Sequence, residues 1–271
     1  MDKLAIFGVP RSGTSWLGQI FNSHPNVTMR NQPLFSYEHK GRLNETSSQK
    51  EIYSFFEEIY NSRDDFALMA SEAQKNYPIF SKSTNQTHII FKETRYLQIV
   101  ENILGQCPNV KILGIVRNPL ATLASWLQAP KEYNPEWIFL DEWRLASSKN
   151  QNKPEEFYGF SKWKEVAENF LRFEEMYPNQ FKLVRYDQLN ENPLNIADEL
   201  LKFCGLILHP QVEEFIRTSQ SKHDADPYSV FRAKRSDNQW QKILPADVIK
   251  QVQKELANTP LQTFLVDISN A

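Results

Sequence analysis

The chain has 271 residues, of which 41% are hydrophobic and 24% charged, and its formal net charge is −2. These values are ordinary for a globular enzyme with one large α/β domain or two small ones. Because the net charge is close to zero, no overall basic surface recruits nucleic acid or an acidic membrane. Any anion site must therefore come from a local cluster of cations.

Three further features concern the compartment. No apolar run reaches the ~20 residues that a membrane-spanning helix needs. The apolar start, residues 4–9, is too short for the hydrophobic region of a secretory signal peptide. Cys107 and Cys204 lie far apart without a CxxC spacing, which predicts buried, reduced thiols. We therefore expect a cytoplasmic protein without a leader and without an integral membrane segment.

The expected elements alternate between strands and helices. Short apolar runs typical of buried strands occupy residues 4–7, 88–91, 111–116 and 181–186. Helical spacing of apolar residues is found at 15–22, 120–127, 161–176, 194–204, 210–218 and 245–257. Such alternation favours a parallel sheet covered on both faces. The predicted fold is a three-layer α/β/α arrangement in a single domain spanning residues 1–271.

A glycine-containing loop separates the first expected strand from the first expected helix. Residues 8–15 read Gly-Val-Pro-Arg-Ser-Gly-Thr-Ser. At this place the backbone N–H groups and the positive end of the helix can point at one anion. Gly13 lets the backbone approach that anion, and Thr14 and Ser15 add hydroxyl donors. Arg11 adds a planar cation that can bind a phosphate with two hydrogen bonds.

The loop differs from that of nucleoside triphosphatases at one position. Their pattern is GxxxxGK[ST], in which the Lys contacts the terminal phosphates and the Ser or Thr holds Mg²⁺. Gly8 and Gly13 have the required separation, but Thr14 stands where that Lys belongs. ATP hydrolysis is therefore disfavoured. A nucleotide kinase-like enzyme with an altered loop stays as an alternative, and dependence on Mg²⁺ would support it.

At this loop the sequence resembles a known family. Residues 10–17, Pro-Arg-Ser-Gly-Thr-Ser-Trp-Leu, are similar to the 5′-phosphosulfate loop of sulfotransferases that use 3′-phosphoadenosine 5′-phosphosulfate (PAPS). Residues 21–27 resemble the carbohydrate-modifying and bacterial members. The resemblance implies that PAPS is the sulfuryl donor and that no metal is needed. It assigns the loop's cofactor contacts to Arg11, Ser12, Gly13, Thr14, Ser15 and Trp16.

A second phosphate site is expected at the third apolar strand. Arg117 follows that strand, and Ser125 lies on the next helix. Both side chains can reach one phosphate because both face the carboxyl edge of the sheet. The family's 3′-phosphate motif has an Arg and a Ser at this spacing, so the resemblance implies that role for both. Two phosphate sites on one edge suit a nucleotide phosphorylated at its 3′ and 5′ positions.

Two weaker matches lie nearer the C-terminus. Residues 183–189 are similar to the family's strand-end tyrosine segment, which implies that Tyr186 lies beside the nucleotide. The basic residues 231–236 stand where the family closes a loop over the cofactor, so we expect residues 220–245 to form that closing segment. It lacks the glycines of the cytosolic pattern, which leaves the choice among its cations open. Arg235 is the preferred ligand for the 3′-phosphate.

The expected chemistry is an in-line displacement with charge building on the leaving oxygen. Arg11 is the residue expected to neutralise that oxygen and so to be catalytic. A hydroxyl acceptor also benefits from a general base. Carbohydrate-acting relatives place a Glu before a Pro-Leu pair after the first helix, but this chain has Gln32 there, which cannot be a base.

The identity of the base stays open. Glu93 lies near the position at which cytosolic relatives carry a catalytic His, and it is the preferred candidate. Glu38 and His39 are the other options. Lys92 is expected to help bind the sulfate of the cofactor. If the chain has no base, it would be a non-catalytic nucleotide-binding module, which is the second alternative to the enzyme.

The resemblance favours a sugar hydroxyl as the acceptor. Residues 35–85 are rich in aromatic side chains and are expected to cover the acceptor cleft, because aromatic rings stack on sugars. The same rings suit apolar acceptors, so small alcohols, phenols and natural products stay as alternatives. The sequence does not reveal the oligomeric state.

Overall fold

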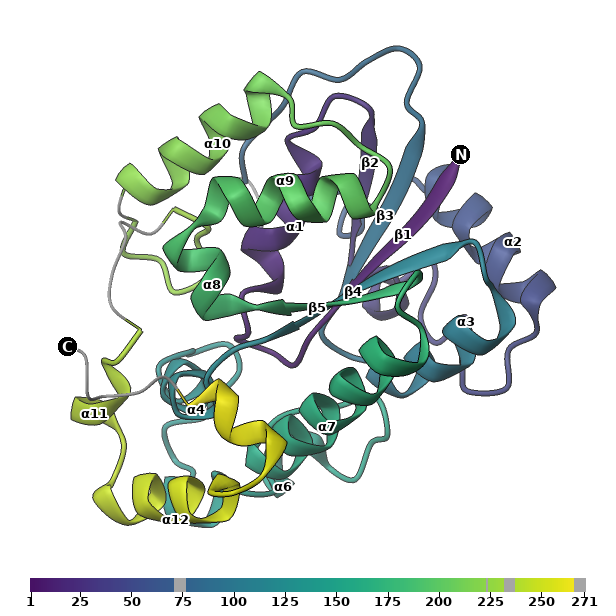
Figure 1. Ribbon diagram of the computed structural model, residues 1–271. Helices are drawn as coiled ribbons and strands as arrows, with labels where there is room; N and C mark the ends of the chain where they lie inside the picture. The colour runs from purple at the N-terminus through teal and green to yellow at the C-terminus, as the bar shows by residue number, and fades with distance from the viewer. Residues whose placement is uncertain (71–76, 223, 232–236, 266–271) are drawn as a thin grey trace.

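The computed structural model describes residues 1–70, 77–222, 224–231 and 237–265. Its centre is a parallel sheet of five strands in the order β2-β3-β1-β4-β5 (Figure 1). The strands are β1 (Asp2–Phe7), β2 (Val27–Asn31), β3 (His88–Glu93), β4 (Val110–Val116) and β5 (Phe181–Arg185). All neighbouring pairs run parallel. The predicted α/β fold with a central parallel sheet is confirmed.

The sequence predicted four of these strands and missed β2. Only Val27 and Met29 are apolar in this five-residue segment, so its pattern resembled a loop after the first helix. β2 is an edge strand that pairs with β3 alone. Its Arg30 donates hydrogen bonds to the carbonyls of Ile59 and Tyr60, both at 2.6 Å. These bonds satisfy a cation that would otherwise be costly within a sheet.

Helices α1 (Thr14–Asn22), α8 (Tyr186–Glu191), α9 (Pro193–Phe203) and α10 (Pro210–Ser221) lie together on one side of the sheet (Figure 1). Leu4 and Ile6 of β1 join the apolar cluster that these helices build with the sheet. Ala5 and Phe7 belong to the cluster on the opposite face. The two-residue period of the strand thus supplies both halves of the core.

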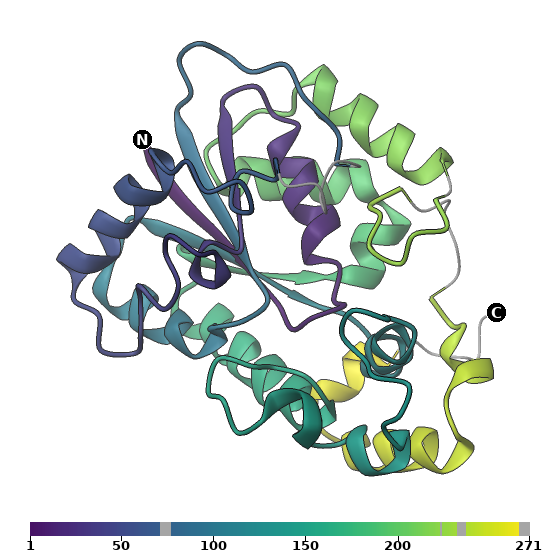
Figure 2. The same ribbon diagram turned by 180° about the vertical axis from the view of Figure 1, so that it is seen from behind.

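The opposite layer is formed by helices α2 (Gln49–Tyr60), α3 (Val100–Gln106), α4 (Pro119–Leu127), α7 (Phe160–Met176) and α12 (Ala246–Leu256). Figure 2 shows this layer from behind. Shorter helical turns complete the described chain: α5 (Phe139–Glu142), α6 (Ser147–Asn150), α11 (Trp240–Ile243), and the 3₁₀ turns at Pro33–Phe35, Leu97–Ile99 and Pro260–Phe264. With helices on both faces, the structure has the predicted three layers.

Helix α4 starts at the carboxyl edge of the sheet and positions part of the site. Asn118 caps it, because its side-chain oxygen accepts a hydrogen bond from the backbone N–H of Leu120 at 2.9 Å. Pro119 occupies the first turn, where its missing N–H costs nothing. The chain therefore turns sharply from β4 into the helix, which places Arg117 at the strand end.

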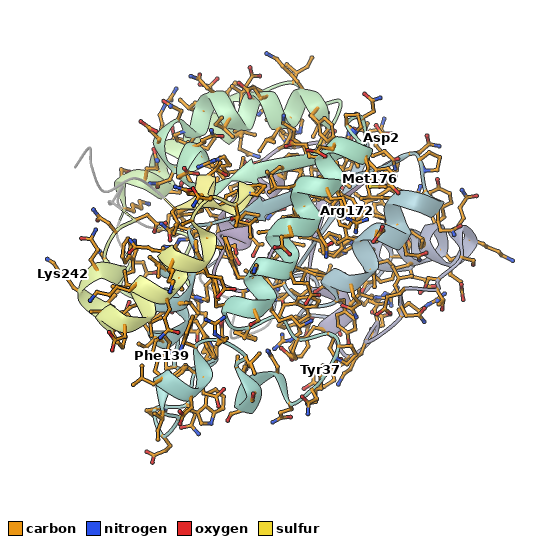
Figure 3. The ribbon with its side chains drawn as sticks, turned by 60° about the horizontal axis from the view of Figure 1, so that its bottom comes forward. Asp2, Tyr37, Phe139, Arg172, Met176 and Lys242 are labelled. Atoms are coloured by element: carbon orange, nitrogen blue, oxygen red, sulfur yellow. The ribbon has the colours of Figure 1, made fainter. Side chains whose placement is uncertain are left out.

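Three further features concern an ion pair on the surface, the two cysteines and the character of the helices. Arg172 and Met176 lie on the last turns of α7 (Figure 3), and Arg172 pairs with Glu101 at 2.7 Å. Cys107 and Cys204 are both buried and unbonded to each other. Among the described helices, none combines the length and the apolar character that crossing a lipid bilayer requires.

Candidate functional site

A cavity of about 770 Å³ lies at the carboxyl edge of the sheet. Its walls come from segments far apart in the sequence: the loop after β1, the end of β3, helix α4 and the residues that follow it, the start of α8, and the described parts of 219–243. In open parallel sheets, ligands bind at this edge because the loops after the strands converge there. The cavity is therefore the candidate site.

The loop between β1 and α1 has the backbone that an anion cradle requires. Arg11 and Gly13 adopt left-handed conformations, with φ of +73° and +94°. A side chain on Gly13 would bring its Cβ to 2.5 Å from the Tyr186 ring. Gly13 is thus required both for the turn and for the close approach of that ring. Helix α1 follows at once, so its positive end faces the cavity.

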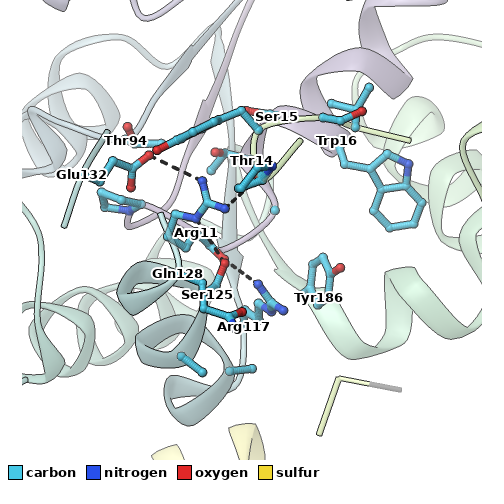
Figure 4. Close-up of a pocket in the computed structure, with 18 of the residues that line it drawn as sticks. Arg11, Thr14, Ser15, Trp16, Thr94, Arg117, Ser125, Gln128, Glu132 and Tyr186 are labelled. Atoms are coloured by element: carbon cyan, nitrogen blue, oxygen red, sulfur yellow. Dashed lines mark hydrogen bonds and ion pairs between the residues drawn. The ribbon is translucent and has the colours of Figure 1, made fainter. Parts of the chain in front are cut away.

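The Arg11 guanidinium connects three parts of the cavity wall (Figure 4). Its Nε–H donates to Ser125 Oγ at 3.1 Å, and its Nη2 donates to the carbonyl of Pro227 at 2.7 Å. Its Nη1 lies 3.5 Å from Glu132 Oε1. The guanidinium carbon is 5.1 Å from the centre of the Tyr228 ring. Arg11 is therefore held in place by α4, by the segment after α4 and by residues 227–228.

The Arg117 guanidinium lies beside the same loop. Its Nη1 donates to the carbonyl of Arg11 at 2.9 Å, and its carbon is 4.8 Å from the centre of the Tyr186 ring. Its Nε and Nη2 bind both oxygens of the Asp237 carboxylate. Burial alone would lower the pKa of Arg117, but the Asp237 carboxylate outweighs burial and raises that pKa overall. Arg117 is thus a permanent cation.

The structure brings most of the predicted cofactor residues to this cavity. Those that line it are Arg11, Gly13, Thr14, Ser15, Trp16, Arg117, Ser125 and Tyr186. Ser12 does not line it: its side chain is fully buried, and its backbone N–H donates to the Val9 carbonyl at 3.2 Å. Arg235, the predicted 3′-phosphate ligand, lies outside the described residues.

Glu93, the preferred base, is not among the residues that line the cavity. It is fully buried, and its Oε1 accepts a hydrogen bond from the backbone N–H of Leu34 at 2.8 Å. Burial raises the pKa of this carboxyl group. Side chains alternate along β3, so the preceding residue, Lys92, does line the cavity. Burial lowers the pKa of that amine.

The other two base candidates also lie elsewhere. Glu38 is on the surface, where its Oε2 accepts a hydrogen bond from Ser62 Oγ at 2.6 Å. His39 is buried and packs edge-on against the Phe55 ring. Neither is a lining residue of the cavity, whereas Gln32 is. Gln32 accepts a hydrogen bond from Thr94 Oγ1 at 2.8 Å.

The two segments expected to cover the cavity contribute differently. From the described part of residues 35–85, only Tyr77 lines it, while Phe55 and Phe56 are core residues. The described part of residues 220–245 contributes many lining positions, among them Tyr228, Asp237 and Trp240. The aromatic content of 35–85 was thus mainly a signal of packing.

Sequence reasoning missed five charged residues of the cavity wall: Lys131, Glu132, Arg95, Lys149 and Asp237. A signal for the first two did exist. Ser125 was expected in the site near the end of its helix, so the residues directly after that helix had to pass the same site. Nothing in the pattern around Lys149 or Asp237 marked them.

The described wall of the cavity is strongly cationic. Its six cationic side chains are Arg11, Lys92, Arg95, Arg117, Lys131 and Lys149, and its two carboxylates are Glu132 and Asp237. Among the described residues no cluster of His, Cys, Asp and Glu could hold a metal ion. A concave site with this excess of positive charge is suited to a polyanionic ligand.

Comparisons with known proteins agree with this geometry. A model of the sulfotransferase family matches residues 4–210. Carbohydrate sulfotransferase 5 of Mus musculus is 22% identical, over 93% of this chain and 77% of its own length. Carbohydrate sulfotransferase 6 of Homo sapiens is 26% identical, over 71% of this chain and 49% of its own length. This chain thus spans about half of the human relative.

Solved structures share the fold. The mouse sulfotransferase SULT7A1 complexed with PAP (3′-phosphoadenosine 5′-phosphate) superposes with a TM-score of 0.55 at 15% identity. The match covers 97% of this chain and 88% of that one. Retinol dehydratase in a complex with retinol and PAP gives a TM-score of 0.52 at 16% identity, covering 96% and 82%. The family match over residues 4–210 shows that this chain belongs to the sulfotransferase family.

Proposed function

We propose that this sulfotransferase takes the sulfuryl group of PAPS and transfers it to a hydroxyl group of a carbohydrate. One observation carries the proposal: Arg11 and Arg117, which follow different strands, meet at one cavity, where Arg117 Nη1 donates to the Arg11 carbonyl at 2.9 Å. Two fixed cations on one sheet edge suit a nucleotide with two separate phosphate groups.

The residues of the wall fit such a donor. The loop around Gly13 and the positive end of α1 would hold the 5′-phosphosulfate, because both direct partial positive charge into the cavity. Arg117 and Ser125 would hold the 3′-phosphate. Trp16 and Tyr186, whose rings pack edge to face 6.2 Å apart, offer flat surfaces beside these sites. Six lining cations against two carboxylates match the negative charge of PAPS.

The chemistry asks mainly for electrostatic stabilisation. As the sulfur leaves the nucleotide, negative charge develops on the 5′-phosphate oxygen. Arg11 would neutralise this charge, because its guanidinium is already held over the loop by Ser125 and Pro227. Lys92 lines the cavity from β3 and would contact the sulfuryl group. No residue needs to form a covalent bond.

The comparisons support the donor and the acceptor class. Two of the solved structures with the same fold were obtained in complex with PAP, which is the product of PAPS after sulfuryl transfer. The two relatives described above are carbohydrate sulfotransferases. Their identity to this chain is between 22% and 26%, so the saccharide acceptor is the finer part of the proposal.

Calorimetry with PAP in metal-free buffer tests the donor site. We expect tight binding by the wild type and a loss of about 10- to 100-fold in Arg117→Ala, because hydrogen bonds to charged groups contribute about 1.5–3 kcal/mol. Arg172→Ala is the matched control, since Arg172 of α7 pairs with Glu101 of α3 and does not line the cavity. Equal affinity for ADP and PAP would contradict the 3′-phosphate site.

A further inference from the structure

Transfer to a hydroxyl group requires a proton acceptor near the reacting oxygen, and the cavity offers few. The usual bases are imidazoles and carboxylates, and the base must lie within hydrogen-bond reach of the hydroxyl. Among the described residues that line the cavity there is no histidine, and the carboxylates are Glu132 and Asp237. The choice therefore lies between these two side chains.

Asp237 lies at the nucleotide end of the cavity. Both of its oxygens bind the Arg117 guanidinium, the cation proposed for the 3′-phosphate. The 3′-phosphate lies on the ribose, several bonds away from the sulfur that reacts. A carboxylate paired with Arg117 is thus at the wrong end of the donor to meet the acceptor hydroxyl.

Glu132 lies at the reacting end. Its Oε1 is 3.5 Å from Nη1 of Arg11, the cation proposed for the leaving oxygen. Its Oε2 is buried and has no hydrogen-bond partner among the described residues. Figure 4 shows this carboxylate on the far side of Arg11 from Ser125 and Arg117. One oxygen is therefore oriented by the catalytic cation, and the other is left to accept a hydrogen bond.

The backbone of Glu132 is fixed in this position. Its N–H donates to the Ala129 carbonyl at 2.9 Å, and its carbonyl accepts a hydrogen bond from Trp126 Nε1 at 3.2 Å. Trp126 is a core residue of α4 with 2% exposure. Through these bonds the end of α4 places the carboxylate relative to Arg11. A side chain held on a rigid element is what a catalytic geometry requires.

We infer that Glu132 is the general base of the reaction, an inference that rests on the proposed function. Its Oε2 takes the proton of the acceptor hydroxyl while the hydroxyl oxygen bonds to sulfur. The bond between sulfur and the 5′-phosphate oxygen breaks, and its electron pair stays on the phosphate beside Arg11. The proton is then released from Glu132 to solvent, which restores the carboxylate.

The test compares Glu132→Gln with Glu136→Gln. Glu136 is an exposed residue of the same loop that does not line the cavity. The assay is the transfer of labelled sulfate from PAPS to 4-nitrophenyl glycosides, with calorimetry of PAP as a check on the fold. We expect Glu132→Gln to bind PAP at least as tightly as the wild type and to lose about 10²- to 10⁴-fold in kcat. Glu136→Gln should match the wild type.

A second variant separates catalysis from structure. Added formate should restore part of the activity of Glu132→Ala, because a small carboxylate can occupy the space that the side chain leaves. A Glu132→Gln enzyme with the kcat of the wild type would overturn the inference and leave the proposed function standing. A wild type that binds PAP but sulfates no glycoside overturns the proposed acceptor, and the inference with it.

Discussion

At the scale of single residues, the pair of Arg117 and Asp237 has a direct effect on binding. The carboxylate holds the guanidinium with hydrogen bonds to Nε and Nη2. A 3′-phosphate that binds the same guanidinium must compete with this internal anion. With the 3′-phosphate site proposed above, part of the interaction with the nucleotide would be used to displace Asp237.

This competition predicts that Asp237→Asn binds PAP more tightly. The amide no longer repels the phosphate and holds Arg117 less strongly, so we expect a gain of about tenfold or more, in line with the 1.5–3 kcal/mol of a charged hydrogen bond. Calorimetry measures this gain in PAP affinity. ADP lacks the 3′-phosphate, and its affinity should not change. Weaker PAP binding by Asp237→Asn would show that Asp237 helps to hold the nucleotide.

Residues with a local signal could be predicted, and those without one could not. Arg11 and Gly13 stand in a loop whose composition and place in the chain predict a phosphate site, and both line the cavity. Asp237 reaches the cavity only through tertiary packing, far from either motif, whereas Glu132 follows the helix of Ser125 and had that position as its only signal. Glu93 shows the converse: its distance from Lys92 in sequence is one residue, yet the strand period turns it away from the cavity.

At the scale of elements, β4 is a strand whose packing leaves no room at Gly114. A Cβ at this position would meet the ring of Phe181 and would lie 2.7 Å from the ring of Phe170. Phe181 lies on β5 and Phe170 on α7, and both rings are buried. The absence of a side chain at Gly114 therefore lets α7 pack closely against the sheet.

We expect Gly114→Ala to lower the free energy of unfolding by about 1–3 kcal/mol, because overpacking a core forces buried groups to move. Gly105→Ala is the matched control. Gly105 lies in α3 with no atom within 4 Å of an added Cβ, so the change should stabilise by about 0.4–1 kcal/mol. Urea denaturation followed by circular dichroism measures both. Equal effects of the two changes would contradict this account of the packing.

Strands were predictable where their apolar residues form a compact run in the sequence. The inner strands β1, β3 and β4 are continuous apolar runs, and all were found from the sequence. The edge strand β2 is also largely buried, but it mixes apolar and polar residues and so contains no such run. Its hydrogen bonds to β3 depend on a partner that lies more than fifty residues away, which no local pattern reveals.

At the scale of the whole molecule, the cavity joins distant parts of the chain. Its wall includes Arg11 near the N-terminus, Arg117 and Glu132 in the middle, and Asp237 and Trp240 near the C-terminus. A ligand that contacts all of these segments binds the folded state and not the unfolded chain. Its binding free energy then adds to the stability of the whole fold.

PAP at about 100 times its Kd should therefore stabilise the protein by about 2.7 kcal/mol, which corresponds to a rise in Tm of about 5–10 °C for a chain of this size. Differential scanning fluorimetry measures the rise. ADP at the same concentration should give a smaller one, since it lacks the group that binds Arg117. An unchanged Tm at a saturating PAP concentration would contradict binding in this cavity.

The central position of β1 has a consequence during synthesis. β1 ends at Phe7, but the strands on either side of it are β3 and β4, and β4 ends only at Val116. At a translation rate of about 5–20 residues per second, several seconds pass before both partners exist. Until β3 has been made, the apolar side chains at residues 4–7 have no strand to pair with. The nascent chain, rather than the finished protein, is thus the form most exposed to aggregation.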